Sequence, residues 1–285
     1  MRWTDLRRST NVEDRRGSGV GSIGGFKLGG CGLVLLVIIS FFLGINPLEF
    51  LGILQQTQTT TQQPVPGAPP PANDPSADFV SAVVGDTEDT WGKLFQKMGG
   101  QYEPPKLILF RDAVQSACGF ASAAVGPFYC PSDGQVYLDL GFFEELSRRF
   151  GAPGDFARAY VIAHEIGHHV QNLTGVSSKV QQRRAQVDQE SANALSVRQE
   201  LQADCFAGVW GYYAKQKNVV EPGDVEAALN AAAQIGDDRL QRETKGYVSP
   251  ESFTHGSSEQ RARWFRTGME SGDVNRCDTF NVRTL

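Results

Sequence analysis

The apolar and polar positions of the chain divide it into an uncharged apolar run, a polar stretch and a long patterned part. The run LGGCGLVLLVIISFFLGI covers residues 28–45, and no charged residue lies between Lys27 and Glu49. As a helix it would be about 27 Å long, close to the roughly 30 Å hydrocarbon core of a bilayer. We therefore expect one transmembrane helix over residues 28–48. A buried core helix and a cleaved signal peptide are the alternatives, but the run has no polar face, and the GINPLEF at its end offers no small-residue cleavage pattern.

The polar stretch follows directly. Its central part, QQTQTTTQQPVPGAPPPANDPS, covers residues 55–76 and has no aromatic and hardly any aliphatic side chain. Its prolines favour extended, solvated backbone. We expect residues 49–77 to be a flexible tether between the apolar run and a folded domain.

The patterned part, residues 78–285, predicts one α+β domain. The short apolar runs PPKLILF and QVYLDL, the latter after a Pro-Ser-Asp-Gly turn, are typical of strands. Apolar residues elsewhere recur mostly at helical spacing. A small sheet followed by many helices favours an α+β domain over alternating parallel units. The expected helices cover residues 78–98, 142–150, 155–175, 177–217, 221–241 and 257–271.

Charge is distributed unevenly along the chain. Of 27 Lys and Arg and 32 Asp and Glu, residues 1–27 hold six basic and three acidic side chains, a net charge of +3, which leaves −8 for the remainder. An acidic body repels phosphate backbones, so we do not expect nucleic acid as a partner. Positive charge beside a membrane span stays in the cytoplasm. This predicts a single-pass cell-membrane protein with a cytoplasmic basic tail over residues 1–27 and an extracytoplasmic domain.

Four cysteines lie beyond the apolar run, namely Cys118, Cys130, Cys205 and Cys277. An even number in a compartment that permits disulfides favours two bridges. Three pairings are possible, and we favour Cys118 with Cys130, because a short loop closes readily, and Cys205 with Cys277. Buried free thiols or a zinc cluster are the alternative, although the chain has no CxxC that would favour a metal.

The segment AYVIAHEIGHHVQ carries the chemistry that is easiest to interpret. His164 and His168 are four residues apart, so on a helix both imidazoles project from one face. Glu165 lies beside them and could reach a water on a shared ion. This is the HExxH pattern, in which Zn²⁺ activates water and the glutamate acts as general base. The apolar flanks indicate a buried helix, where polar side chains need partners.

A catalytic zinc site of this kind needs a third protein ligand. Thr174 and Gln171 stand where an extended HExxHxxGxxH pattern would place histidine and glycine, which excludes that subclass. In RQELQAD, Glu200 and Asp204 share one helix face. We expect Glu200 to bind the metal and Asp204 to accept a hydrogen bond from the outer nitrogen of a histidine ligand. A solvated helix face is the alternative, and Asp188 and Glu190 are weaker ligand candidates.

The other two histidines have different expected roles. His169 is turned away from its neighbour by about a quarter of a helical turn, which suggests a hydrogen-bonding or surface role. His255, in THGSSEQRARWF, is a candidate donor to a developing oxyanion, with an ordinary loop histidine as the alternative. Arg261, in the same stretch, could bridge to an acid or to substrate.

Nearly the whole chain resembles the bacterial "putative neutral zinc metallopeptidase" family. The segments that carry this resemblance are RRSTNVEDRRG, CGFASAAVGPFYCPSDGQVYLDLGFFEEL, DFARAYVIAHEIGHHVQNLTG, RQELQADCFAGVW and THGSSEQRARWF. The resemblance implies a membrane-anchored, zincin-like domain with zinc on His164 and His168 and Glu165 as base. ExxxD also resembles the helix of glutamate-type zincins. THGSSEQR is similar to a segment of CAAX-processing peptidases, although Gly256 stands where a proline is usual.

Together these features predict a zinc metallopeptidase that hydrolyses peptide or protein substrates. We expect an extended peptide to lie along an edge strand formed by residues 135–139. Two other functions are considered: a non-catalytic, zinc-stabilised binding protein of the cell envelope, and a zinc amidase acting on cell-wall peptide.

Overall fold

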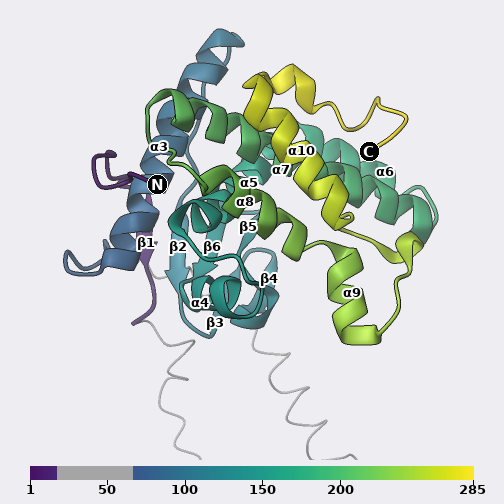
Figure 1. Cartoon of the computed structure of the whole chain (residues 1–285), viewed down its shortest axis with the longest axis horizontal. Coiled ribbons are helices and arrows are strands. Elements are labelled where there is room, and N and C mark those ends of the chain that lie inside the picture. Colours follow the sequence, from purple (N-terminus) through teal and green to yellow (C-terminus); the bar gives the residue numbers. More distant parts are fainter. Residues whose placement is uncertain (18–66) are drawn as a thin grey trace, which may run out of the picture. The chain divides into compact units, whose positions relative to one another are not determined.

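The computed structural model describes residues 1–17 and 67–285 (Figure 1). Its main sheet has four strands in the order β1 (Val12–Asp14), β2 (Leu107–Phe110), β6 (Gln135–Asp139) and β5 (Phe128–Cys130). β1, β2 and β6 are parallel, and β5 is antiparallel to β6. A separate hairpin joins β3 (Ala113–Ser116) to β4 (Gly119–Ser122).

Eight α-helices are present in the described residues, which agrees with the expected α+β class. Several have clear start signals: Asp74 caps the first, and Ser257 forms a capping box with Gln260 at the last. The helices are α3 (Pro75–Lys97), α4 (Gly141–Arg148), α5 (Asp155–Leu173), α6 (Val176–Arg184), α7 (Gln189–Gln216), α8 (Asp224–Gln234), α9 (Asp237–Lys245) and α10 (Ser258–Ser271).

Residues 1–17 form an N-terminal arm that belongs to the same compact unit as residues 68–285. β1 pairs in parallel with β2, with Val12 opposite Leu107. The indole Nε1 of Trp3 donates a hydrogen bond to Asp155, the first residue of α5, at 3.0 Å. The segment expected as a separate tail is therefore packed as part of the same compact unit.

The charge of the arm has a structural explanation. Arg8 pairs with Asp78 at 2.6 Å, and Arg7 pairs with Glu88 and Asp89 at 2.7 and 2.9 Å. All three carboxylates lie on α3. The basic residues near the start of the chain thus complement an acidic helix face, and their charge does not require a cytoplasmic location.

The expectation of a fold preceded by a transmembrane helix is not upheld. In residues 1–17 and 67–285, no helix combines the length and apolar character needed to cross a bilayer. The segment predicted as the span, residues 28–48, lies outside the described residues, as does most of the proposed tether.

Some predicted boundaries also differ from the structure. The long helical region 177–217 is two helices, α6 and α7, and Asp188 caps the second by accepting from the Ser191 amide at 2.8 Å. The helix expected over 221–241 is likewise split into α8 and α9, which begins after Gly236. The segment 135–139 is the inner strand β6, and the edge strand is β5.

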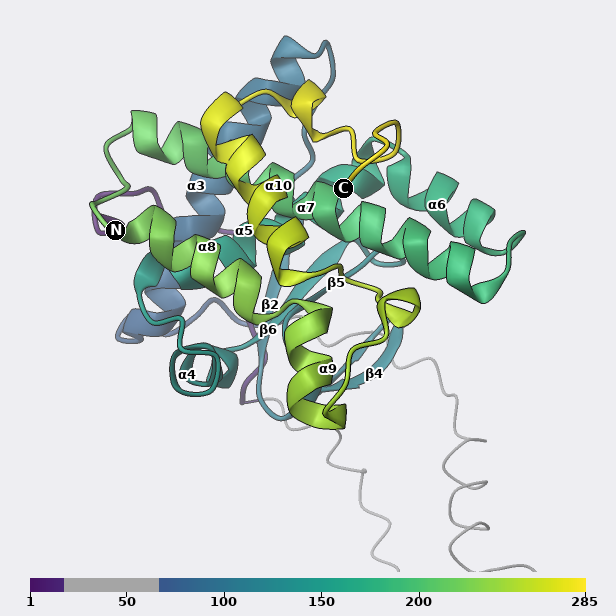
Figure 2. The same cartoon turned by 45° about the vertical axis from the view of Figure 1, so that its right-hand side comes forward.

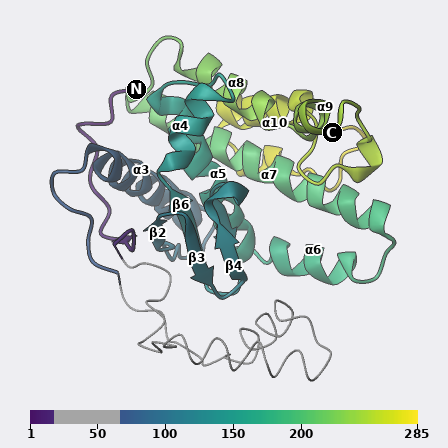
Figure 3. The same cartoon turned by 90° about the horizontal axis from the view of Figure 1, so that it is seen from below.

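Helix α7 is at the centre of the helical part. It packs against α5 and α10, and Figures 2 and 3 show it between α10 and α6. Gly208 of α7 and Gly268 of α10 permit a very close approach, because a Cβ at Gly268 would lie 2.0 Å from the carbonyl oxygen of Cys205. Gly167 of α5 similarly lies against Ala203 of α7.

Two disulfides join the cysteines in the favoured pairing. Cys118 bonds to Cys130, and Cys205 of α7 bonds to Cys277 in the short 3₁₀ helix Val274–Cys277. The second bond holds the C-terminal segment against the helix that carries Glu200.

Candidate metal centre

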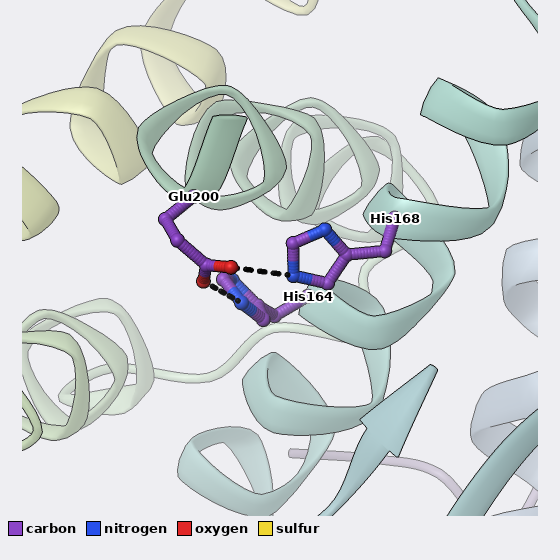
Figure 4. A group of neighbouring side chains, drawn as sticks. All are labelled: His164, His168 and Glu200. Carbon is purple, nitrogen blue, oxygen red and sulfur yellow. Dashed lines mark hydrogen bonds and ion pairs between the residues drawn. The ribbon is translucent and has the colours of Figure 1, made fainter. Parts of the chain in front are cut away.

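Three side chains from two packed helices converge on one point (Figure 4). His164 and His168 project from α5, and Glu200 projects from α7. The Nε2 of His164 lies 3.2 Å from Oε2 of Glu200, and the Nε2 of His168 lies 3.4 Å from Oε1. One ligand atom from each of the three residues lies within 4.8 Å of the others. The structure thus brings together the three ligands expected from the sequence.

A buried charged network supports His164. Its Nδ1 donates to Oδ1 of Asp204 at 2.8 Å, and the Tyr160 hydroxyl donates to the same oxygen at 2.6 Å. Arg261 of α10 donates from Nε and Nη2 to the two oxygens of Asp204 at 2.9 and 3.0 Å. Asp204 is fully buried, and Arg261 is 3% exposed. The outer nitrogen of His164 is therefore fixed as a donor, which leaves Nε2 to face Glu200.

The network shifts the ionisation of its members. Burial alone lowers the pKa of His164, but the Asp204 carboxylate and the hydrogen bonds to Asp204 and Glu200 outweigh it and raise that pKa to about 10. Burial alone raises the pKa of Asp204, yet Arg261 and His164 lower it to about 2. Asp204 is thus ionised, and its negative charge stabilises the positively charged form of His164.

His168 has a neutral partner instead. Its Nδ1 lies 2.9 Å from Oε1 of Gln171, one turn further along α5. Burial alone lowers the pKa of His168, but the Glu200 carboxylate outweighs it and raises this pKa. Burial alone also raises the pKa of Glu200, but the two imidazoles bring it well below its ordinary value.

The arrangement of donors fits a zinc ion. Both histidines have an acceptor at Nδ1, so both Nε2 atoms point toward one carboxylate. A divalent cation between them would be held by two imidazole nitrogens and by the negative charge of Glu200. Two imidazoles and one carboxylate are a donor set of catalytic zinc sites, which keep a further position for water. His164, His168 and Glu200 would hold the ion.

Glu165 lies next to these ligands on the wall of a cleft of about 570 Å³. Its side chain is buried, and burial raises its pKa. A carboxylate with a raised pKa is suited to accept and return a proton near neutral pH. The same cleft is lined by His164, His168, Glu200, Tyr160 and Arg261.

The cleft opens between the edge of the sheet and the C-terminal helices. One wall comes from residues 124–129, which include Phe128 and Tyr129 of β5, and from side chains within and just after α4. Leu240 and Thr244 of α9 and the loop at His255 form another wall. Aromatic and aliphatic side chains dominate between these walls, among them Phe128, Phe142, Phe150, Val161, Ile235 and Leu240.

His255 lies in this cleft and is held by one acidic side chain. The Asp237 carboxylate accepts from the backbone amides of Thr254, His255 and Gly256 at 2.7, 2.6 and 3.1 Å. It also lies 3.1 Å from Nδ1 of His255, and this hydrogen bond raises the pKa of the imidazole. Its Nδ1 is therefore engaged, and the side chain lines the same cavity as the three ligands.

His169 faces away from the three ligands. Its Nε2 donates to the Glu103 carbonyl at 2.7 Å, and its Nδ1 lies 3.1 Å from the Tyr129 hydroxyl. Burial lowers its pKa, which favours the neutral ring. Since Tyr129 belongs to β5, His169 connects the edge strand to α5, in the hydrogen-bonding role that the sequence suggested.

Several functional neighbours were not identified from the sequence. Tyr160 precedes His164 by one helical turn, and Gln171 follows His168 by three residues, so helical spacing was an available signal for both. Gln202 had no such signal, because its partners come from other elements. Of the weaker ligand candidates, Asp188 caps α7 and Glu190 lines a different cavity.

Comparisons with known proteins agree with this geometry. A family model described as "putative neutral zinc metallopeptidase" matches residues 1–280. The uncharacterized protein YpfJ of Escherichia coli K12 is 49% identical over 287 residues, covering 98% of this chain and 99% of its own. An uncharacterized protein of Mycobacterium tuberculosis H37Rv is 43% identical over 261 residues, covering 86% of each chain. No solved structure matches the chain.

Proposed function

Because the chain belongs to the putative neutral zinc metallopeptidase family, we propose that it is an active zinc-dependent peptidase that hydrolyses peptide bonds in the cleft. One observation carries the proposal: the Nε2 atoms of His164 and His168 converge on Glu200, and Glu165 lines the same cavity. When bound, zinc would lower the pKa of a water molecule and polarise the carbonyl of the substrate.

Residues of the chain carry out proton transfer, stabilise the oxyanion and position the ligands. A Glu165 carboxylate oxygen takes the proton of the attacking water and then delivers it to the nitrogen of the leaving amine. His255 donates from Nδ1 to Asp237, which raises the pKa of the ring, and in its imidazolium form it also presents Nε2 as a donor to the developing oxyanion. Asp204 and Arg261 keep the His164 ring in place throughout.

The cleft favours an extended peptide with a bulky apolar side chain. β5 is the edge strand of the sheet and lines the cleft, so a peptide would add beside it through backbone hydrogen bonds. Phe128, Phe142 and Leu240 offer apolar surface to a side chain of the peptide. We expect cleavage beside aromatic or long aliphatic residues.

The two disulfides support an extracytoplasmic location for the domain, since such bonds persist in oxidising compartments. The N-terminal arm would lie in the same compartment, because it belongs to the same unit. Thiol alkylation of the protein in intact cells, before and after reduction, tests this. Four freely alkylated cysteines without reduction would contradict it.

The function is tested with Glu165→Gln in the full chain. Zinc content and cleavage of a mixed library of short peptides are measured by metal analysis and mass spectrometry. We expect the variant to keep its zinc and to lose cleavage by roughly a hundredfold or more, as for a general base. Glu144→Gln, which changes an exposed carboxylate on α4, is the control and should cleave as the wild type does.

Two results would reject the proposal. Equal cleavage by wild type and Glu165→Gln would exclude this glutamate as the base. A zinc-loaded wild type that cleaves no peptide would favour the non-catalytic envelope protein, or the amidase if it releases products from peptidoglycan fragments.

A further inference from the structure

Two glutamines connect the second histidine ligand to the C-terminal segment. Gln171 lies on α5, is fully buried and faces Nδ1 of His168 with Oε1 at 2.9 Å. Its Nε2 donates to the Gln199 carbonyl at 2.7 Å and to Oε1 of Gln202 at 3.0 Å. Gln202, also buried, donates from Nε2 to the Cys277 carbonyl at 3.0 Å.

The direction of this chain of hydrogen bonds follows from its fixed ends. Backbone carbonyls only accept hydrogen bonds, so the amide nitrogen of Gln202 must face Cys277, and its oxygen must face Gln171. The amide nitrogen of Gln171 must face the Gln199 carbonyl for the same reason. The oxygen of Gln171 is then the only atom of this amide left for His168, whose Nδ1 must carry the proton.

The position of this proton decides which nitrogen of His168 can bind the metal. With the proton on Nδ1, the lone pair of His168 lies on Nε2, the nitrogen that faces Glu200. The other histidine ligand, His164, is held in the same tautomer by a charged partner, Asp204. The two histidines therefore have different supports, an anion for one and a neutral amide for the other.

The Cys277 carbonyl, at the far end of this series of hydrogen bonds, is also held in place. Cys277 bonds through its sulfur to Cys205 of α7, and its carbonyl accepts from the Thr279 amide at 3.0 Å. The Thr279 hydroxyl donates to the carbonyl of Arg198, again on α7, at 2.6 Å. The Cys277 carbonyl is thus fixed relative to the helix that supplies Glu200.

We infer that Gln171 and Gln202 are positioning residues for metal binding. Through hydrogen bonds that begin at the disulfide-anchored Cys277 carbonyl, they orient His168 and fix its tautomer. Neither glutamine is among the three ligands. The inference rests on the metal site of the proposed function, but it does not require that the protein hydrolyse anything.

Two substitutions of Gln171 separate positioning from simple packing. Gln171→Met removes the acceptor from His168, and the zinc affinity should fall roughly 10- to 100-fold, the usual cost of losing a residue that orients a ligand. Gln171→Glu keeps an acceptor there, so we expect an affinity closer to that of the wild type. A purely structural role predicts the opposite order, because a buried carboxylate next to the Gln199 carbonyl is tolerated less well than methionine.

Zinc dissociation constants of the full chain are measured by competition with a chromophoric chelator, alongside unfolding in denaturant. Gln202→Met should also weaken binding, but less, because Gln171 keeps its bond to the Gln199 carbonyl. If Gln171→Met does not fold, Gln202→Met still tests the inference. Gln234→Met is the control, since this partly buried glutamine of α8 bonds only to Asn230 among the described side chains, at 3.1 Å, and should leave the affinity unchanged.

An unchanged zinc affinity in both methionine variants would overturn the inference, and so would weaker binding by Gln171→Glu than by Gln171→Met. Failure of the proposed function gives a different result: a wild type that binds zinc but cleaves no peptide. In that case the order of zinc affinities still decides whether the glutamines position His168.

Discussion

Asp204 accepts a hydrogen bond from Nδ1 of His164 at 2.8 Å, although the two residues lie 40 positions apart in the sequence. The same carboxylate is paired with Arg261 of α10. One acidic side chain thereby connects three helices at the metal centre, so its replacement should affect both stability and metal binding.

Asp204→Asn is expected to lower the free energy of unfolding by roughly 3–5 kcal/mol, because it leaves the buried Arg261 guanidinium without a charged partner. Zinc affinity should fall by about 10- to 100-fold as His164 loses its anionic support. Denaturant unfolding and chelator competition measure the two effects. Asp238→Asn, at a less buried carboxylate of α9, is the control. An unaltered zinc affinity would show that the carboxylate serves stability alone.

Gly268→Ala should force α10 away from α7, since the new Cβ would lie 2.0 Å from the Cys205 carbonyl oxygen. We expect a loss of roughly 1–3 kcal/mol in the free energy of unfolding, typical of overpacking. The peptidase activity should also fall, because α10 carries Arg261. Chemical unfolding and the peptide assay measure these effects, and a stability equal to that of the wild type would contradict the close contact.

Gly85→Ala should release the N-terminal arm, because a Cβ there would lie 2.4 Å from the carbonyl oxygen of Arg7. Limited trypsin digestion, followed by mass analysis, should show faster cleavage after Arg7 and Arg8. Gly92→Ala lies on the same helix with nothing within 4 Å of its added Cβ. It should instead stabilise the protein by about 0.5–1 kcal/mol. Equal digestion of the two variants would argue against docking of the arm.

The contact of His255 with Asp237 should make stability depend on pH in a defined window. The hydrogen bond from Asp237 raises the pKa of His255, so this stabilisation is complete below about pH 6.5 and is lost as pH rises through the raised pKa. Burial alone raises the pKa of Asp237, but His255 and the loop amides lower it, so its stabilisation is present above about pH 3.9 and lost at lower pH.

The contact is thus strongest between these limits. The difference in unfolding free energy between wild type and His255→Gln, measured across pH 3–9, should peak within the window. A difference that grows above pH 8 would have the wrong sign.

The two disulfides should contribute unequally to stability. Cys205 and Cys277 are separated by 72 residues, and Cys118 and Cys130 by 12. In the chain-entropy account, opening the longer loop by double substitution to serine costs about 4 kcal/mol, and opening the shorter one about 3 kcal/mol. Loss of the Cys205–Cys277 disulfide should also weaken zinc binding, because the Cys277 carbonyl that accepts from Gln202 would no longer be held in place. Denaturant midpoints and zinc competition test both statements.

The residues of the metal centre were predictable from sequence because their geometry is local. His164 and His168, like Glu200 and Asp204, are four apart, and a helix alone places each pair on one face. Their meeting requires α5 to pack on α7, which the apolar flanks of both segments indicated. The role of Gln202 could not be predicted, since it depends on where the C-terminal segment returns to α7.

The N-terminal arm shows the opposite case. Arg7 and Arg8 were interpreted as cytoplasmic positive charge, but their partners on α3 are far away in the sequence. A parallel pairing of β1 with β2 leaves no local pattern that marks it. The spacing of residues predicts which side chains share a face of one helix or strand, whereas pairings between distant segments are seen only in the folded structure.

The pairing of β1 with β2 also sets an order of events during synthesis. Glu13 beside β2 forms an ion pair with Lys106, which the ribosome adds 93 residues later. At roughly 5–20 residues per second, the arm waits on the order of 5–20 seconds for its partner strand. Val12–Asp14 therefore have no partner in the main sheet until Leu107–Phe110 have been synthesised, so the arm cannot dock before β2 exists.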